Sequence, residues 1–368
     1  MTWRECRLGD FMRLQRGHDL PAQDREYGEV PVVSSSGITG HHSKAKAAAP
    51  GVVTGRYGTL GEVFFLDRDY WPLNTSLYVT DFKGNDPKFT AYFLRNVLKD
   101  YQSDKAAVPG IDRNVLHELK VRAPDLAPQL RIVNVLAAYD DLIDNNRRRI
   151  KLLEDSVRLL FDEWFVRQQV PPHLESWPEE EPLHHSVADL CVEVKAQVLP
   201  EAIDADTSYI GLEHMPRRSI TLSDWGTATD VTSTKLRYAE GDIIFGKIRP
   251  YFHKVGIALT DGVCSSDAIV MRPRAESWRP LLLAFVSSDA FIAATAQGMK
   301  EGSKMPRADW KQMRAYSLCV PNQRVLSAFN GVVEPVLQQV KTLALQARAL
   351  RTARDLLLPR LMSAGIQA

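Results

Sequence analysis

The chain repeats itself at long range. Residues 105–165 resemble residues 302–362 at a constant offset of 197. Several identical or similar residues keep this offset: Pro109 and Pro306, Asp112 and Asp309, Pro124 and Pro321, Val135 and Val332, Leu153 and Leu350, Leu160 and Leu357. In both copies a short polar loop leads to a strand-like run, a proline and then a long helix with a heptad pattern. Two similar halves that each end in a helix predict a molecule that performs one task twice, at a fixed separation.

Length and composition limit the class of protein. A chain of 368 residues is too long for one ordinary hydrophobic core and predicts two or three domains. No apolar run is long enough to span a bilayer, and the N-terminal residues lack the apolar core of a signal peptide. The four cysteines are scattered without a CxxC pair, which argues against a zinc site or a disulfide framework and fits a reducing cytoplasm. We therefore expect a cytoplasmic protein without a membrane segment.

The formal net charge is only +1. A non-specific nucleic-acid binder usually carries a strong basic excess, so the charge does not support that class. It leaves open a sequence-specific binder that gains affinity from partner proteins.

Each half begins with mixed structure. In the first half, β-rich runs bounded by Gly, Pro, Asn or Asp lie at 30–35, 51–55, 61–67 and 76–82. A helix is predicted over 87–102, and a loop, one helical turn and a strand over 108–124. In the second half, strand signals lie at 207–215, 241–248, 254–260 and 267–273, and a helix is predicted over 279–297.

Two long helices carry the heptad pattern. From about residue 128 to 168, seam residues recur in steps of four and three at Ile132, Leu136, Tyr139, Ile143, Asn146, Ile150, Leu153, Val157, Leu160 and Trp164. The last helix carries the same positions plus 197: Phe329, Val333, Val336, Val340, Leu343, Ala347, Leu350, Arg354, Leu357 and Leu361. A lone helix with such a stripe needs a partner. We expect the two helices to pair antiparallel and to set two globular domains at opposite ends of a rod.

Several segments together carry a resemblance to a known family. They are VPVVSSSGITGHHSK (30–44), GVVTGRYGTLGEVFFLDRDYWPLNTSLYV (51–79), YIGLEHM (209–215) and GDIIFGKIRPYFHKVGIA (241–258). With the duplicated Pro–strand–Pro–helix segment, the chain resembles the specificity (S) subunit of type I restriction–modification systems over nearly its full length. The second copy brings Gln323 and Arg324 closer to Pro321 than the first brings Gln129 to Pro124, which leaves one turn of helix register open.

The resemblance implies an α/β (α+β) fold. Two mixed α/β target-recognition domains would each read one half of a split DNA site, and long helices forming an antiparallel coiled coil would separate them, with a pseudo-twofold internal repeat. The expected parts are recognition domain 1 (1–128), a central helical spacer (129–168), a linker (169–182), recognition domain 2 (183–321) and a C-terminal helical spacer (322–368). The helices would dock two DNA methyltransferase subunits, and a motor-endonuclease subunit could join them. The family's S subunit has no catalytic activity of its own.

The residues agree with a non-catalytic role. The sequence has no P-loop, HExxH or GxSxG motif, no NPPY-like motif for base methylation and no GxGxxG after a strand. The pairs His41–His42 and His184–His185 make poor metal sites, because neighbouring residues on a strand point to opposite faces. We expect no catalytic residue, no metal and no cofactor.

Three pairs of segments are candidates for contact with double-stranded DNA. Arg is suited to bidentate contact with guanine or phosphate, and Ser, His and Lys are suitable donors. Strand alternation through GKIRPYFHK would place Lys247, Arg249 and Tyr251 on one basic and aromatic face. The alternatives are a solvated hairpin loop at 34–44, a solvated strand at 246–254 and a mobile loop before each final strand. The candidates are Ser35, Ser36, His41, His42, Lys44, Arg56, Tyr57, Thr59, Arg113, Asn114, Lys247, Arg249, Tyr251, His253, Lys254, Lys304 and Arg307.

Four helix residues are candidates for contact with partner subunits. Trp164 and Phe165 could anchor a methyltransferase subunit or cap the coiled coil against a neighbouring domain. Arg149 belongs to a solvated or partner-facing helix surface. Asn146 either fixes the helix register as a buried polar group or lies at a wet part of the seam.

We interpret the chain as a sequence-specific DNA-binding subunit. Because the halves carry different polar side chains, the two half-sites should differ in sequence. One alternative is a coiled-coil decoy or inhibitory protein that binds the methyltransferase subunits without reading DNA. A stand-alone metal-dependent hydrolase would need clustered ligands that the sequence lacks. The sequence does not name the bases read or the spacer length.

Overall fold

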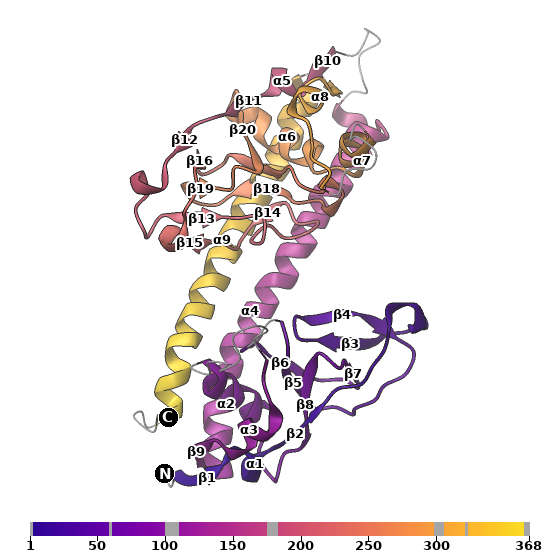
Figure 1. The fold of residues 1–368 in the computed structure, drawn as a ribbon. Coiled ribbons are helices and arrows are strands. Elements are labelled where there is room, and N and C mark those ends of the chain that lie inside the picture. Colours follow the sequence, from indigo (N-terminus) through magenta and orange to yellow (C-terminus); the bar gives the residue numbers. More distant parts are fainter. Residues whose placement is uncertain are drawn as a thin grey trace. The chain divides into compact units, whose positions relative to one another are not determined.

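The computed structural model describes residues 3–58, 61–99, 110–174, 183–297, 305–320 and 323–363. The chain divides into two compact units. Unit 1 holds residues 1–142 and 350–368, and unit 2 holds residues 143–349. Each unit combines strands and short helices with parts of two long helices (Figure 1).

Unit 1 contains three small sheets. Their strand orders are β1-β9, β2-β8-β5-β6 and β4-β3-β7. The strands are β1 (Trp3–Arg7), β2 (Arg13–Arg16), β3 (Val30–Ser34), β4 (Gly37–His42), β5 (Gly51–Gly55), β6 (Val63–Leu66), β7 (Trp71–Pro72), β8 (Ser76–Asp81) and β9 (Lys120–Pro124). The short helices are α1 (Leu8–Phe11), α2 (Pro87–Lys99) and α3 (Arg113–Glu118).

The apolar face of α2 forms the centre of the unit 1 core. The helix begins at Pro87, as predicted, because the fixed φ of proline suits the first helical position. Phe89, Phe93 and Leu94 are buried against the sheet that contains β5 and β6. The rings of Phe93 and Phe11 lie 4.8 Å apart, which ties α2 to α1.

Unit 2 contains a two-stranded sheet and two five-stranded sheets. Their orders are β10-β21, β11-β20-β17-β18-β14 and β12-β16-β19-β13-β15. The strands are β10 (Leu183–Ser186), β11 (Cys191–Val194), β12 (Gln197–Val198), β13 (Ser208–Ile210), β14 (Thr221–Leu222), β15 (Gly226–Thr227), β16 (Lys235–Tyr238), β17 (Ile243–Gly246), β18 (Val255–Ala258), β19 (Gly262–Cys264), β20 (Ala268–Pro273) and β21 (Ser317–Val320). The short helices are α5 (Val187–Leu190), α6 (Arg279–Val286), α7 (Asp289–Gln297) and α8 (Trp310–Met313).

The two units repeat one topology. The order β2-β8-β5-β6 in unit 1 matches β11-β20-β17-β18 in unit 2, and β1-β9 matches β10-β21. The caps of α3 and α8 also match, since the Asp112 and Asp309 carboxylates accept the backbone N–H two residues later at 2.8 and 2.9 Å. The internal duplication predicted from the sequence is therefore confirmed at the level of strand order.

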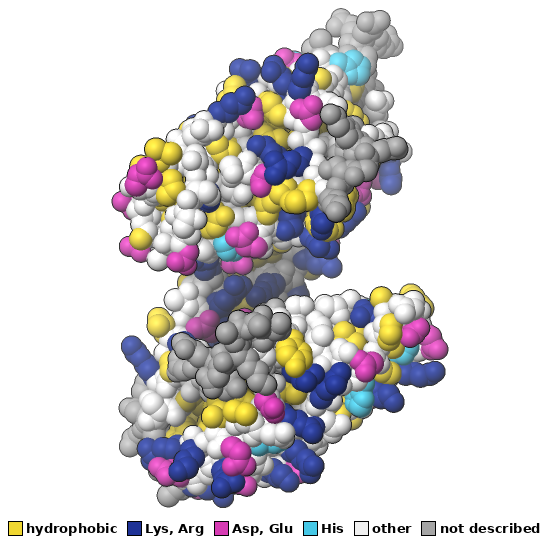
Figure 2. Space-filling model, in the orientation of Figure 1, with side chains coloured by type: hydrophobic (Ala, Val, Ile, Leu, Met, Phe, Trp, Pro, Cys, Tyr) yellow, Lys and Arg dark blue, Asp and Glu magenta, His cyan; other side chains and the backbone are white. Residues whose placement is uncertain are grey.

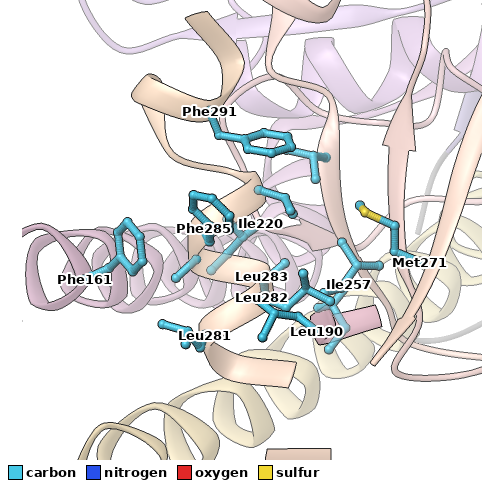
Figure 3. Packing of buried hydrophobic residues seen from close by; sticks show 14 of the residues in the cluster. Phe161, Leu190, Ile220, Ile257, Met271, Leu281, Leu282, Leu283, Phe285 and Phe291 are labelled. Carbon is cyan, nitrogen blue, oxygen red and sulfur yellow. The ribbon is translucent and has the colours of Figure 1, made fainter. Parts of the chain in front are cut away.

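The core of unit 2 gathers around α6, whose residues Leu281, Leu282 and Leu283 are fully buried (Figure 3). Phe161 contributes from a long helix, and its ring lies 6.5 Å from that of Phe285. The prediction of one helix over 279–297 is wrong, because the chain bends by 65° between α6 and α7. The bend follows Ser287, whose hydroxyl donates to the Leu283 carbonyl at 2.7 Å and competes with the helical pattern.

Across the described residues, no single helix is long and apolar enough to cross a membrane. The bent pair Glu276–Val286 and Asp289–Gln297 meets that test by length and composition alone. The α6 part of this pair lies in the core of unit 2.

The long helices are α4 (Leu126–Phe161), which continues into a π-helical turn, η2 (Asp162–Val166), and α9 (Gln323–Met362). In unit 1 the beginning of α4 shares a core with the end of α9. In unit 2 the end of α4 shares a core with the beginning of α9. The helices are therefore antiparallel, as predicted. The pseudo-twofold relation of the halves stays a prediction.

The helix register follows the constant offset. Ile132 and Leu136 are buried in α4, and their counterparts Phe329 and Val333 are buried in α9. The one-turn shift that the glutamine and arginine positions left open is not seen. Gln129 has its own local role, because its buried amide donates to Asn85 Oδ1 at 2.7 Å and to the Pro124 carbonyl at 2.9 Å.

Candidate nucleic-acid interface

In unit 1 the loop after β5 lies against the loop before α3. The N–H of Arg56 donates to the Thr75 carbonyl at 2.9 Å, and the N–H of Ile111 donates to the Arg56 carbonyl at 2.9 Å. Tyr57 and Gly110 form an isolated antiparallel bridge beside these bonds. The fold thus brings together two candidate segments that are more than 50 residues apart in the sequence.

Arg56 and Tyr57 form a stacked pair on this loop. The guanidinium carbon of Arg56 lies 4.5 Å from the centroid of the Tyr57 ring, and its Nη2 donates to the Tyr57 hydroxyl at 3.3 Å. A Cβ atom at Gly110 would lie 2.6 Å from Cε1 of Tyr57, so the close approach of the two loops requires glycine. Because Tyr57 is 42% exposed, the pair presents a cation and an aromatic face at the surface.

Unit 2 repeats this arrangement with other side chains. The N–H of Lys247 donates to the Asp267 carbonyl at 2.8 Å, and the N–H of Ala308 donates to the Lys247 carbonyl at 2.8 Å. Ile248 and Arg307 form the isolated bridge. Lys247 therefore occupies the position that Arg56 occupies in unit 1. We call the two arrangements the bridged loops: Arg56–Tyr57 with Gly110–Ile111, and Lys247–Arg249 with Pro306–Ala308.

The prediction that GKIRPYFHK is a strand is wrong. β17 ends at Gly246, and the chain turns through a 3-10 helix, η6 (Pro250–Phe252). Arg249 and His253 have φ angles of 51° and 52° in the left-handed region, and Pro250 has no N–H to pair. Lys247, Arg249 and Tyr251 do not share a strand face, because strand alternation does not apply to them. Arg249 and Tyr251 are nevertheless exposed, the latter to 48%.

Two predicted DNA contacts in this segment are used inside unit 2. His253 is only 8% exposed, and its Nε2 lies 3.2 Å from Oδ1 of Asp289. Burial lowers the pKa of His253. Lys254 Nζ donates to the Leu212 carbonyl at 2.5 Å, and burial lowers its pKa as well. These contacts withdraw both side chains from the surface on which DNA contact would occur.

Arg217 is a surface cation that sequence reasoning missed. Its guanidinium carbon lies 3.9 Å from the Phe252 ring centroid, on the same ring that Arg249 approaches at 5.9 Å. The adjacent basic pair at 217–218 was the available sequence signal. Arg307, by contrast, was predicted, and it forms an exposed ion pair with Asp267 at 3.2 Å.

The segment 34–44 is a β-hairpin rather than an open loop. Ser35 and Ser36 lie in the turn between β3 and β4, and His41 and Lys44 are exposed. His42 is 5% exposed, and its Nδ1 accepts the Glu26 N–H at 3.0 Å. His42 is therefore directed into unit 1, whereas the neighbouring His41 is exposed.

Two other candidates from the third pair of segments are placed at the surface. Arg113 and Asn114 are exposed in the first turn of α3. Thr59 and Lys304 lie outside the described residues. In the described parts of the chain, no group of three or more His, Cys, Asp or Glu side chains could hold a metal ion.

Comparison with known proteins shows what the chain is similar to. Residues 1–155 match the family model described as the type I restriction modification DNA specificity domain. The chain is 21% identical over 301 residues to the type I restriction enzyme MjaIX specificity subunit of Methanocaldococcus jannaschii. The chain is thus similar to type I restriction–modification specificity subunits. The alignment covers 74% of this chain and 66% of that relative, which is just under two thirds of its length.

A solved structure shares the fold of this chain. It is the type I restriction–modification system S subunit from M. genitalium, which matches with a TM-score of 0.59 at 15% identity. The match covers 98% of this chain and 96% of that subunit. The mixed α/β fold with long helices is therefore confirmed over nearly the whole chain.

Three of the four side chains that were predicted to contact partner subunits are buried. Trp164 and Phe165 are 8% and 4% exposed, and their rings lie 6.1 and 4.9 Å from that of Phe329 on α9. They cap the helix pair inside unit 2, which was the alternative to partner contact. Asn146 is 7% exposed and lies within the seam, whereas Arg149 is exposed.

Charged side chains of both signs are mixed on the face of the chain that Figure 2 draws. Lys and Arg side chains are interspersed there with Asp and Glu. This pattern agrees with the net charge of +1. This face therefore carries no broad basic field of the kind that non-specific nucleic-acid binders present.

Proposed function

We propose that the chain is the non-catalytic DNA-reading subunit of a type I restriction–modification complex and recognises a bipartite, asymmetric site. The bridged loops carry the proposal. The same main-chain hydrogen bonds hold Arg56 in unit 1 and Lys247 in unit 2 at equivalent positions. Arg and Lys are the side chains that most often contact guanine in the major groove.

Different side chains around the equivalent positions support an asymmetric site. Tyr57 follows Arg56 in one unit, whereas Ile248 and Arg249 follow Lys247 in the other. Since the backbones match and the side chains differ, each unit would present a different pattern of donors and apolar groups to base edges. The two half-sites would then differ in sequence.

The long helices would dock two DNA methyltransferase subunits, which a motor-endonuclease subunit could join. Large apolar side chains remain exposed along them: Leu142 (51%), Leu152 (69%), Leu159 (65%), Val166 (56%), Val332 (51%) and Leu356 (61%). Exposed apolar stripes on a helix favour coverage by another protein. Methyl transfer would belong to these partners, and the complex would work in the cytoplasm. The five-part division at 128, 168, 182 and 321 remains our proposed assignment of recognition domains, spacers and linker.

The test measures binding and methylation by the chain assembled with its methyltransferase subunits. Arg56→Ala should weaken binding of the cognate site by about 1–3 kcal/mol, with a smaller effect on a duplex altered in the half that unit 1 reads. Lys247→Ala should do the same for the other half. Arg68→Ala is the matched control, because Arg68 is an exposed arginine of unit 1 that pairs with Asp67.

Two outcomes would contradict the proposal. Equal losses on every duplex, with a salt slope reduced by about one, would make Arg56 a phosphate contact and not a base contact. A complex that contains the methyltransferase subunits but leaves no footprint on any DNA would favour the coiled-coil decoy instead.

A further inference from the structure

A cavity of about 340 Å³ opens in unit 1 between β2, the turn after β8 and α3. Its polar lining consists of Arg13, Gln15, Lys83, Arg113, Asn114 and His117. Three of these side chains are permanently cationic, and no Asp or Glu belongs to the lining. The cavity thus gathers positive charge in a chain whose net charge is close to zero.

Most of this charge is not neutralised within unit 1. Arg13 and Arg113 are exposed, and neither forms an ion pair with another residue that the structure describes. Lys83 is paired with Asp81, with Nζ 2.7 Å from Oδ2 and both side chains more than 40% exposed. An exposed pair of this kind offsets only part of the charge of Lys83.

His117 lies in the wall of the cavity, close to both arginines. Its Nε2 accepts the N–H of Leu14 at 2.9 Å, so the ring is held in one orientation. Burial lowers the pKa of His117, and the positive charges of Arg113 and Arg13 lower it further. Both guanidinium groups therefore act on the same small region.

The walls of the cavity are fixed by backbone contacts. A Cβ atom at Gly9 would lie 3.1 Å from the Cβ of His117, so glycine lets α1 and α3 approach closely. The N–H of Leu8 donates to the Leu119 carbonyl at 2.9 Å and holds the far end of α3. A site on such anchored elements loses little side-chain or loop freedom when an anion binds.

We propose that the cavity lined by Arg13, Lys83 and Arg113 binds a backbone phosphate of the DNA whose bases unit 1 reads. Arg and Lys are the usual partners of phosphate oxygens, and the amides of Gln15 and Asn114 add neutral donors. This inference rests on the proposed function and adds to it a contact that positions the duplex.

The position of the cavity along the chain fits one duplex. Arg113 follows Gly110, which is bridged to Tyr57, by three residues. Three residues span at most about 11 Å, and the major groove is about 12 Å wide. A duplex whose base edges meet Arg56 and Tyr57 can therefore place a flanking phosphate at the cavity.

The test compares two duplexes over a range of salt concentrations. The full chain, assembled with its methyltransferase subunits, is titrated with the cognate duplex and with a scrambled duplex between 50 and 200 mM salt. Arg13→Gln and Arg113→Gln should each weaken both duplexes by the same factor. The salt slope should fall by about 0.9 for one lost phosphate contact, so the loss at 50 mM exceeds that at 200 mM by about 3.5-fold.

A variant that is expected to strengthen DNA binding provides a second test. Asp81→Asn removes the carboxylate charge beside Lys83, so it should tighten both duplexes and steepen the salt slope. The asparagine oxygen can still accept the Lys83 N–H, as Asp81 Oδ1 does at 2.8 Å. Arg68→Gln, which removes one exposed charge elsewhere in unit 1, should change neither affinity nor slope.

Three results would overturn the proposal. Unchanged slopes in both arginine variants would remove the phosphate contact, and a loss confined to the cognate duplex would make Arg113 a base contact. If inorganic phosphate binds the wild type but not the arginine variants, and the variants bind DNA as well as the wild type, the cavity would be a site for free phosphate. A wild-type complex that binds the cognate and the scrambled duplex equally would refute the proposed function itself. A wild-type complex that prefers the cognate duplex, together with unchanged salt slopes in the arginine variants, would refute only the phosphate contact at the cavity.

Discussion

Replacing Arg354 with methionine tests how the end of α9 is held in unit 1. Nη1 of Arg354 lies 2.5 Å from Oδ1 of Asp140 on α4, and the side chains are 15% and 25% exposed. The hydroxyl of Tyr92 on α2 donates to the other oxygen of Asp140. Burial and this hydrogen bond raise the pKa of Tyr92. One carboxylate thus joins three helices of the unit.

The expected cost follows from this partial burial. An exposed ion pair contributes about 0–1 kcal/mol, whereas breaking a buried pair costs about 3–5 kcal/mol. Removing Arg354 leaves Asp140 mostly buried with only the Tyr92 hydroxyl as partner. Its second partner, Asp355, is 52% exposed and loses little. We expect Arg354→Met to destabilise the end of α9 by about 2–3 kcal/mol.

Hydrogen exchange is the suitable measurement, because a chain with two compact units need not unfold in one step. Amides after position 354 in α9 should exchange roughly 30- to 140-fold faster in the variant, while amides in the unit 2 part of α9 keep their rates. Adding Asp140→Asn should recover much of the loss, because the neutral amide oxygen can still accept the Tyr92 hydroxyl while no charge is left without its partner. Exchange as slow as in the wild type, or a double variant that loses the sum of both single effects, would refute the reasoning.

Three further changes test other parts of the helices. Glu154 is 4% exposed, and burial raises its pKa although Ser219 donates to it at 2.8 Å. A raised carboxyl pKa gives stability that is present at low pH and lost as the pH rises through the folded pKa, so Glu154→Gln should stabilise unit 2 in urea at pH 7 and have little effect at pH 4. Gly331→Ala should raise the opening free energy of unit 2 amides by about 1 kcal/mol, because the new Cβ meets nothing within 4 Å in an exposed helix interior. Inserting one heptad into both long helices lengthens each by about 10.5 Å, and the preferred spacer between half-sites should grow by about 3 base pairs; an unchanged spacer would show that the helices do not set it.

The long helices were predictable because their signal is local. The expected helix over 128–168 is α4 with η2, and every predicted seam residue of α4 is buried or half-buried. The offset of 197 between the two helix patterns is confirmed, because the same heptad positions face a core in both copies. The strand order β11-β20-β17-β18 was not predictable in this way, since pairing depends on residues far apart in the chain.

The sequence was a poor guide in segments whose structure depends on contacts between residues far apart in the chain. His42 and His253 look like surface donors in the sequence, but Glu26 and Asp289 hold them inside. The pattern in GKIRPYFHK suggested a strand, yet left-handed residues at Arg249 and His253 flank the turn Pro250–Phe252 and redirect the chain. The sequence left two interpretations of Trp164, a contact with a partner subunit and a cap on the coiled coil. The contact between its ring and that of Phe329 favours the cap.

In the bridged loops the backbone fixes where a side chain lies, but it does not determine which side chain lies there. The bonds that hold Arg56 and Lys247 in place use main-chain N–H and C=O groups, which any residue except proline can supply. Side chains at 56–57 and at 247–249 can therefore change without moving the loop, and Gly110 is required only while Tyr57 is present, because a Cβ at 110 would collide with the Tyr57 ring. This division explains why the two copies agree in strand order and helix register yet differ in the exposed residues of these loops. If DNA is read there, the chemistry of recognition can differ between the halves while the backbone that presents it stays the same.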